Sequence, residues 1–249
     1  GLAPQITPAR AAQPETYSLA NGNIEVVVST KNGGFIIRTK EGDVFNKDDN
    51  NKNLLFHNGE YDTSFTSFQV TEGIKVREYI FGGNYSFLDL GENNLSVTQD
   101  ENSIISTWSV DGLIFTQLIQ PVWNDSANEH GTIAIYYTVQ NTKETDVDVK
   151  ARLLLDTALG DQDYGYYELA KADGGYLDIV REAVVQGEDV PANFFAYDNL
   201  SNPSITAFTI NDTATEGVKP YKVAFGHWNN LAATVFDFDP DSDLTFTNK

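Results

Sequence analysis

Apolar and polar side chains alternate along most of this chain, in short runs that turn-forming residues separate. Period-two alternation is typical of strands that bury one face. Turn signals recur about every 8–12 residues, a spacing that favours a β-sandwich. The sequence therefore predicts an all-β fold, a large antiparallel sandwich of two sheets (supersandwich-like) with few short helices.

Three pairs of strand-like runs are joined by short turns and predict hairpins. The clearest turn is Asp111-Gly112, because Asp-Gly suits a type I′ turn in which both central residues have positive φ. The hairpins are predicted over residues 24–39, 103–119 and 132–155, with turns at 32–34, 111–112 and 141–144. Further strands are predicted at 75–81, 193–197, 205–210, 221–225 and 232–238.

Helical signals are weak. Residues 167–172 have the composition for one or two helical turns, and residues 178–186 fit either a helix or a strand.

The chain has 249 residues, roughly twice what a seven-strand sandwich needs. We expect a flexible tail over residues 1–15 and one large domain over 16–249. Two tandem small sandwiches are the alternative, although no linker-like segment separates two halves. Strand-like alternation runs to the last residues, so we expect the natural polypeptide to continue and this domain to be truncated at its C-terminal end.

Charge and composition bear on the function classes. The chain has 16 Lys and Arg against 36 Asp and Glu, a formal charge of −20. Such a charge repels phosphate backbones and anionic lipids, so nucleic acid and membrane surfaces are not expected as partners. No apolar run approaches the ~20 residues of a membrane-spanning helix. Cysteine is absent, which excludes disulfides and thiolate chemistry.

Aromatic residues in predicted loops are the candidate ligand-binding residues. Sugars stack their apolar C–H faces on aromatic rings, and neighbouring carboxylates and amides bind the hydroxyls. The alternative role for Trp and Tyr is packing in the sandwich core. The candidates are Trp123, Tyr164, Tyr166, Tyr167 and Trp228.

A run of acids near the C-terminus is the candidate metal site. Four carboxylates stand at every second position, and an extended backbone would place them on one face, where hard oxygen ligands suit Ca²⁺. The alternative is a set of solvated loop acids. The residues are Asp237, Asp239, Asp241 and Asp243. No cofactor is expected to be required.

Three stretches resemble N-terminal β-rich domains of large extracellular and cell-surface proteins of Gram-positive anaerobes, clostridia and ruminococci among them. They are residues 33–43 leading to 52–55, then 152–163, then 226–232. The resemblance implies a secreted or cell-wall-associated modular protein, part of a polysaccharide-handling assembly, with further domains in the same polypeptide. The chain is more loosely similar to the galactose-mutarotase-like supersandwich, whose catalytic residues do not map onto it.

These observations leave three functions open. The first is a non-catalytic carbohydrate-binding module whose ligand is starch or another plant polysaccharide. The second is a structural or adhesive surface module without glycan binding. The third is a carbohydrate-active enzyme, in which acids of residues 156–173 would meet His130 or His227 in one cleft. No catalytic residue is assigned, because no catalytic motif is present.

Overall fold

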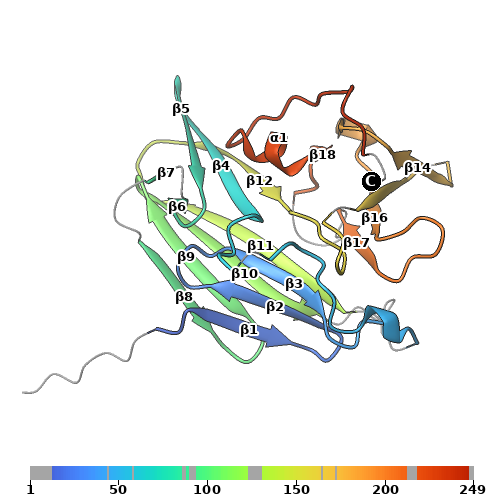
Figure 1. Cartoon of the computed structure of the whole chain (residues 1–249). Helices are drawn as coiled ribbons and strands as arrows, with labels where there is room; N and C mark the ends of the chain where they lie inside the picture. The colour runs from blue at the N-terminus through green and yellow to red at the C-terminus, as the bar shows by residue number, and fades with distance from the viewer. Residues whose placement is uncertain are drawn as a thin grey trace, which may run out of the picture.

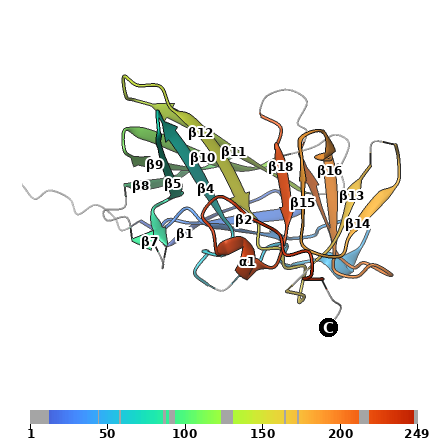
Figure 2. The same cartoon turned by 90° about the horizontal axis from the view of Figure 1, so that it is seen from above.

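The computed structural model describes residues 13–43, 45–57, 59–85, 88–89, 94–122, 131–163, 165–171, 173–211 and 218–246. Strands make up most of the regular structure, and every strand pair in the sheets is antiparallel. The predicted all-β antiparallel fold is therefore confirmed. Strands β1–β12 form one part of the molecule, and β13–β18 lie to one side of it (Figures 1 and 2).

One layer of the first part is a four-stranded sheet. Its spatial order is β11 (Thr132–Asn141), β10 (Leu113–Val122), β9 (Ile104–Val110) and β8 (Leu95–Gln99). The predicted hairpin between β9 and β10 is confirmed, and its turn residues Asp111 and Gly112 have φ angles of 48° and 74°. Buried and half-buried residues alternate along both strands, so a single face supplies the core.

The opposite layer consists of two smaller sheets. The first holds β1 (Thr16–Ala20), β2 (Ile24–Ser29) and β3 (Phe35–Thr39), which confirms the predicted hairpin over residues 24–39. The second holds, in spatial order, β12 (Asp148–Leu154), β4 (Phe65–Glu72) and β5 (Lys75–Ile80). A short pair, β6 (Asn84–Tyr85) with β7 (Leu88–Asp89), follows β5.

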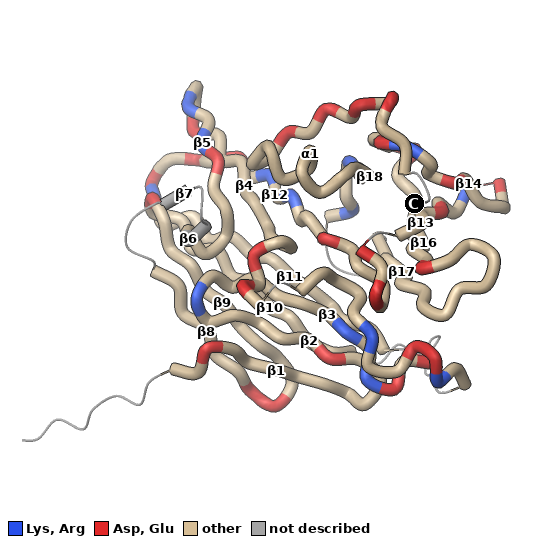
Figure 3. Tube along the Cα trace, viewed as in Figure 1, with Lys and Arg blue, Asp and Glu red and all other residues tan. Residues whose placement is uncertain are grey.

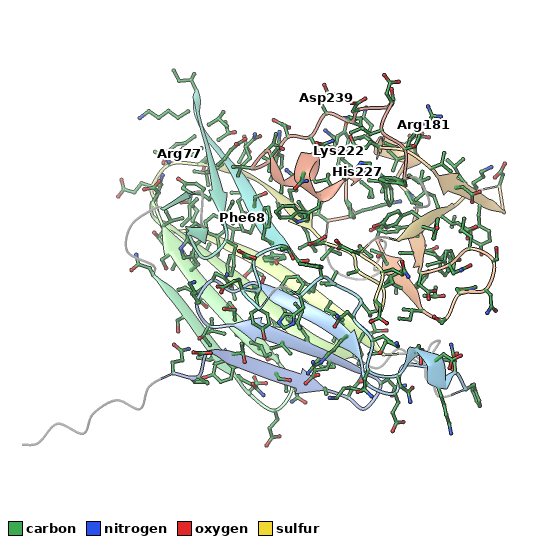
Figure 4. All side chains as sticks on the ribbon, viewed as in Figure 1. Phe68, Arg77, Arg181, Lys222, His227 and Asp239 are labelled. Atoms are coloured by element: carbon green, nitrogen blue, oxygen red, sulfur yellow. The ribbon has the colours of Figure 1, made fainter. Side chains whose placement is uncertain are left out.

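Two apolar clusters fill the space between these layers. One joins β2 and β3 to the four-stranded sheet through Val26, Phe35, Ile104 and Ile119. The other joins β4 and β5 to β9 and β10, and it is mainly aromatic. At its centre the rings of Phe68 and Phe115 are 4.3 Å apart, and both residues are fully buried (Figure 4).

The predicted hairpin between β11 and β12 is wrong. Strand β12 pairs with β4 over its whole length, from Asp148 opposite Thr71 to Leu154 opposite Phe65. The turn after Asn141 therefore carries the chain from one layer to the other. The alternation in both strands is real, but alternation alone does not specify the pairing partner.

The second part begins at β13. A four-stranded sheet runs in the order β14 (Tyr176–Ile179), β13 (Tyr166–Ala170), β16 (Asn193–Tyr197) and β17 (Thr206–Ile210). Strands β15 (Ala183–Gln186) and β18 (Lys222–Phe225) form a separate pair. The weak helical signal at 167–172 is not borne out, because these residues belong largely to β13. The segment 178–186, predicted as a helix or a strand, contains the end of β14 and the whole of β15.

The helical residues are few. The one α-helix among the described residues is α1 (Trp228–Ala232), and two short 3₁₀ helices are η1 (Lys47–Asp49) and η3 (Gly187–Asp189). The predicted strand at 232–238 is wrong, since turns and bends follow α1. The apolar residues Ala232 and Val235 of this segment, with Leu231 before them, pack instead on Phe65, Ile80 and Leu154, which lie on β4, β5 and β12.

The two parts meet at a junction that we call the seam. It brings together the three stretches that carry the resemblance, around residues 52–55, 152–163 and 226–232. Ala158 and Gly160 donate backbone hydrogen bonds of 3.2 and 2.8 Å to Leu54 and Asn53. The indole N–H of Trp228 donates to the carbonyl oxygen of Thr63 at 2.9 Å. Segments far apart in the sequence thus share one junction. The prediction of a single domain over residues 16–249 stays a prediction.

Candidate functional site

Tyr166 and Tyr167 are neighbours on β13, so their side chains point to opposite faces of the sheet. Tyr167 faces inward, where its ring centroid lies 5.1 Å from that of Phe225 and 6.1 Å from that of Phe246. Burial raises the pKa of its hydroxyl, against a hydrogen bond from Thr157. Tyr167 is therefore a core residue, whereas Tyr166 lies on the outward face.

The outward face of the sheet β14-β13-β16-β17 carries a group of aromatic side chains. The strand registers place Tyr166 opposite Tyr197, and Phe195 opposite Phe208. Phe195 is in ring contact with Tyr176, Tyr197 and Phe208, at centroid distances of 5.8, 5.9 and 4.8 Å. We call this group the aromatic face; its members are Tyr166, Tyr176, Phe195, Tyr197 and Phe208.

The aromatic face is open to solvent. Tyr176 is 56% exposed and Phe208 is 49% exposed. Ile210, on the same face of β17, is 38% exposed, so the apolar surface continues along that strand. Large contiguous apolar surfaces on a folded protein mark binding sites for ligands or partners.

Two carboxylates lie among these rings. Glu168 on β13 stands directly opposite Asp178 on β14, and both have the outward parity of Tyr166 and Tyr176. The Tyr197 hydroxyl donates a hydrogen bond to Glu168. Burial, together with this bond and the charge of Glu168, raises the pKa of Tyr197 to about 12, so the phenol stays protonated and serves as a donor.

Trp228, another predicted ligand-binding residue, does not join the aromatic face. Trp228 opens α1, and its indole N–H is engaged by the Thr63 carbonyl oxygen at 2.9 Å. Its ring packs against the cluster of Phe65, Ile80 and Leu154, which gives it a structural position at the seam. Trp123 and Tyr164 lie outside the described residues.

The acidic run after α1 does not adopt the extended strand on which the calcium prediction depends. Residues 237–241 have no regular structure, and 242–243 form a turn in which Asp241 accepts a 3.0 Å hydrogen bond from the backbone N–H of Asp243. Within the described part of the chain, no group of three or more His, Asp or Glu side chains could hold a metal ion. Asp237, Asp239, Asp241 and Asp243 therefore do not come together as a metal-binding group, and Figure 3 shows the acids spread along this loop.

The acids of the seam include one perturbed carboxyl group. Asp156 follows β12, and its backbone N–H donates to the Ser64 hydroxyl at 2.9 Å. Burial raises the pKa of Asp156 to about 6; a hydrogen bond from Thr63 opposes this effect, and the charge of Asp163 adds to it. A carboxyl group with this pKa exchanges protons near neutral pH. Among the described residues, no hydrogen bond or ion pair joins it to His227, and His130 is outside the described residues.

Glu182 is a buried carboxylate held by several hydrogen bonds. It is 2% exposed, and its two oxygens accept hydrogen bonds from the backbone N–H groups of His227 and Asp241 and from the Asn230 amide, each at 2.9 Å. The His227 ring Nδ1 lies 3.1 Å from the same Oε1. These bonds fasten α1 and the segment after it to β15 (Figure 4 shows His227 beside α1).

Sequence reasoning identified Tyr166 but missed the other four members of the aromatic face. A signal was available: Phe195 and Tyr197 stand two residues apart in a predicted strand, and Phe208 stands in the next one. Residues at i and i+2 of a strand share a face. What the sequence did not show is that this face, rather than the one holding Phe194 and Ala196, points to solvent.

An interior hollow is too small for a sugar. It lies between the layers of the first part and has room for about one water molecule, about 10 Å³. Its polar walls are Asn32, Thr66 and Gln117. This hollow therefore does not accommodate a ligand as large as a sugar ring.

Comparison with protein-family models finds no match, and comparisons with curated proteins and with solved structures find none either. Among the described residues, no helix is both long and apolar enough to cross a membrane.

Proposed function

We propose that this chain is a non-catalytic carbohydrate-binding module and that the aromatic face is its binding surface. The observation that carries the proposal is the arrangement of five aromatic side chains on the solvent side of one sheet, with Glu168 and the Tyr197 hydroxyl among them. Aromatic rings offer stacking surfaces for pyranose C–H faces, and the polar groups can bind sugar hydroxyls.

The sheet also supplies rigidity. Its inward residues Leu169 and Phe194 pack with Phe225 of β18, so the rings are presented on a packed scaffold and not on a loop. A preformed surface loses less conformational entropy on binding. An exposed sheet face also suits an extended polymer, which can pass over several strands.

The setting that we propose follows from the sequence. The resemblance to cell-surface domains favours a secreted or cell-wall-associated protein with further domains. It also makes starch or another plant polysaccharide the first ligand to test.

The test is retention on insoluble polysaccharides (starch, cellulose, xylan and chitin), followed by a reducing-sugar assay on the same samples. We expect retention on at least one polymer without release of sugar. The variants Tyr166→Ala and Phe208→Ala should lose retention while keeping the wild-type melting temperature to within a few degrees.

The matched control is Tyr221→Ala. Tyr221 is 70% exposed and precedes β18. The variant therefore removes an exposed ring that does not belong to the aromatic face. Retention that survives both face variants would place the binding surface elsewhere. No retention of the wild-type protein on any glycan would overturn the proposed function, and sugar release would show catalysis.

A further inference from the structure

The carboxylates of the aromatic face form a like-charged pair. Glu168 and Asp178 are direct cross-strand partners on antiparallel strands, where Cβ atoms are about 4.5–5.5 Å apart. Like charges in this arrangement destabilise a sheet. In the described part of the chain, neither carboxylate forms an ion pair with Lys, Arg or His. The described residues therefore place no neutralising cation beside this pair.

Aromatic rings surround this pair. Tyr176 stands two residues from Asp178 on the same face of β14, and its ring contacts Phe195, the residue opposite Glu168 on the other side. The hydroxyl of Tyr197 donates a hydrogen bond to Glu168. An ammonium group at such a site is attracted both by the quadrupole of the aromatic ring and by the negative charge of the carboxylate.

We propose that the ligand of the aromatic face carries protonated amines and is an amino-sugar polymer with free amino groups. The sugar ring would stack on Phe195 or Tyr176, and its ammonium group would lie between Glu168 and Asp178. This inference rests on the proposed function and narrows it to a charge class. Charge complementarity selects the occupant, because the face offers two unneutralised carboxylates and the whole chain carries −20.

The experiment compares ligands of one length, of which the glucosamine and N-acetylglucosamine hexamers differ only in whether the amine is free. Isothermal titration calorimetry would use glucosamine hexamer, N-acetylglucosamine hexamer and maltohexaose, at two salt concentrations and with EDTA present. We expect the glucosamine hexamer to bind most tightly, with an affinity that falls as salt rises.

The double variant Glu168→Gln with Asp178→Asn keeps the size of both side chains but removes both charges. We expect it to lose about tenfold in affinity for the glucosamine hexamer. The matched control is Glu144→Gln with Asp146→Asn, two exposed acids that precede β12. It removes the same net charge, so it should keep most of the affinity.

The outcomes separate the two proposals. Equal affinity for the acetylated and free-amine hexamers, or equal losses in the two double variants, would overturn the amine inference and leave glycan binding standing. Binding that EDTA abolishes would also overturn it, because a metal ion would then neutralise the pair. Failure of all three oligosaccharides and of the polysaccharide panel would overturn the proposed function itself.

Discussion

Glu182 and His227 are 45 positions apart, yet the carboxylate of Glu182 accepts the backbone N–H of His227 at 2.9 Å and lies 3.1 Å from its ring Nδ1. His227 is the residue that immediately precedes α1. The same carboxylate accepts the Asp241 backbone N–H at 2.9 Å. One buried side chain thus holds both ends of the segment that covers the seam.

Replacing Glu182 by Gln should destabilise the protein. The amide keeps one acceptor but turns an N–H₂ group toward a backbone donor, so at least one charge-assisted bond is lost. Bonds of this kind contribute about 1.5–3 kcal/mol each. Urea unfolding should show a loss of that size. Glu188→Gln, at an exposed position on η3, is the control and should leave the midpoint unchanged; a similar loss in both variants would contradict the role of Glu182.

The contribution of Glu182 should also depend on pH. Burial opposes its ionisation, but the hydrogen bonds from His227, Asp241 and Asn230 outweigh burial and lower its pKa. A carboxyl group whose folded pKa lies below its unfolded value, about 4.3, stabilises the protein above that pH and loses the contribution as pH falls further. The stability difference between wild type and Glu182→Gln should therefore shrink in acid, and a constant difference would argue against this linkage.

The contribution of Asp156 to stability should depend on pH in the opposite direction. Its folded pKa is about 6, above the unfolded value of about 3.9. The folded protein therefore binds more protons between these values, and the free energy of unfolding falls as pH rises through this range. Asp156→Asn should remove this fall, so its stability relative to wild type should rise between about pH 4 and pH 7. Parallel pH profiles of the two proteins would contradict the raised pKa.

Trp228→Phe separates a structural role from a binding role. The variant keeps an aromatic ring against Phe65 but removes the donor to the Thr63 carbonyl oxygen. We expect a stability loss of about 1 kcal/mol. Glycan retention should be unchanged, in contrast to Phe208→Ala. A loss of retention at wild-type stability would assign Trp228 to the binding surface, as the sequence alone suggested.

Phe68→Ala tests the central core. The side chain is fully buried, and its ring centroid lies 4.3 Å from that of Phe115 and 5.8 Å from that of Tyr137. Such a deletion costs about 3–5 kcal/mol because it leaves a cavity. Val76→Ala, at a residue that is 57% exposed on the adjacent strand, should change stability by less than about 0.5 kcal/mol. Denaturant midpoints of the two variants provide the measurement, and comparable shifts would contradict the assignment of the core.

Local features of the fold could be predicted with good accuracy. The strand at Asn193–Tyr197 was predicted residue for residue, and the Asp111-Gly112 turn placed β9 against β10. Both depend on neighbours in the sequence: alternation identifies a two-sided strand, and the turn dipeptide permits positive φ. Long-range pairing could not be predicted in the same way. Strand β12 carries the alternation of a hairpin partner for β11 but pairs with β4, some eighty residues earlier.

The same distinction between local and long-range information applies to the candidate site. The sequence by itself determined that this is an acidic, cysteine-free, antiparallel β-protein and that aromatic residues gather near Tyr166. Only the tertiary structure decided that Tyr166 faces solvent while Tyr167 packs on Phe225, and that Phe195, Tyr197 and Phe208 share the outward face. The reason is physical: period two assigns neighbours to opposite faces, but which face is buried depends on what packs against the sheet.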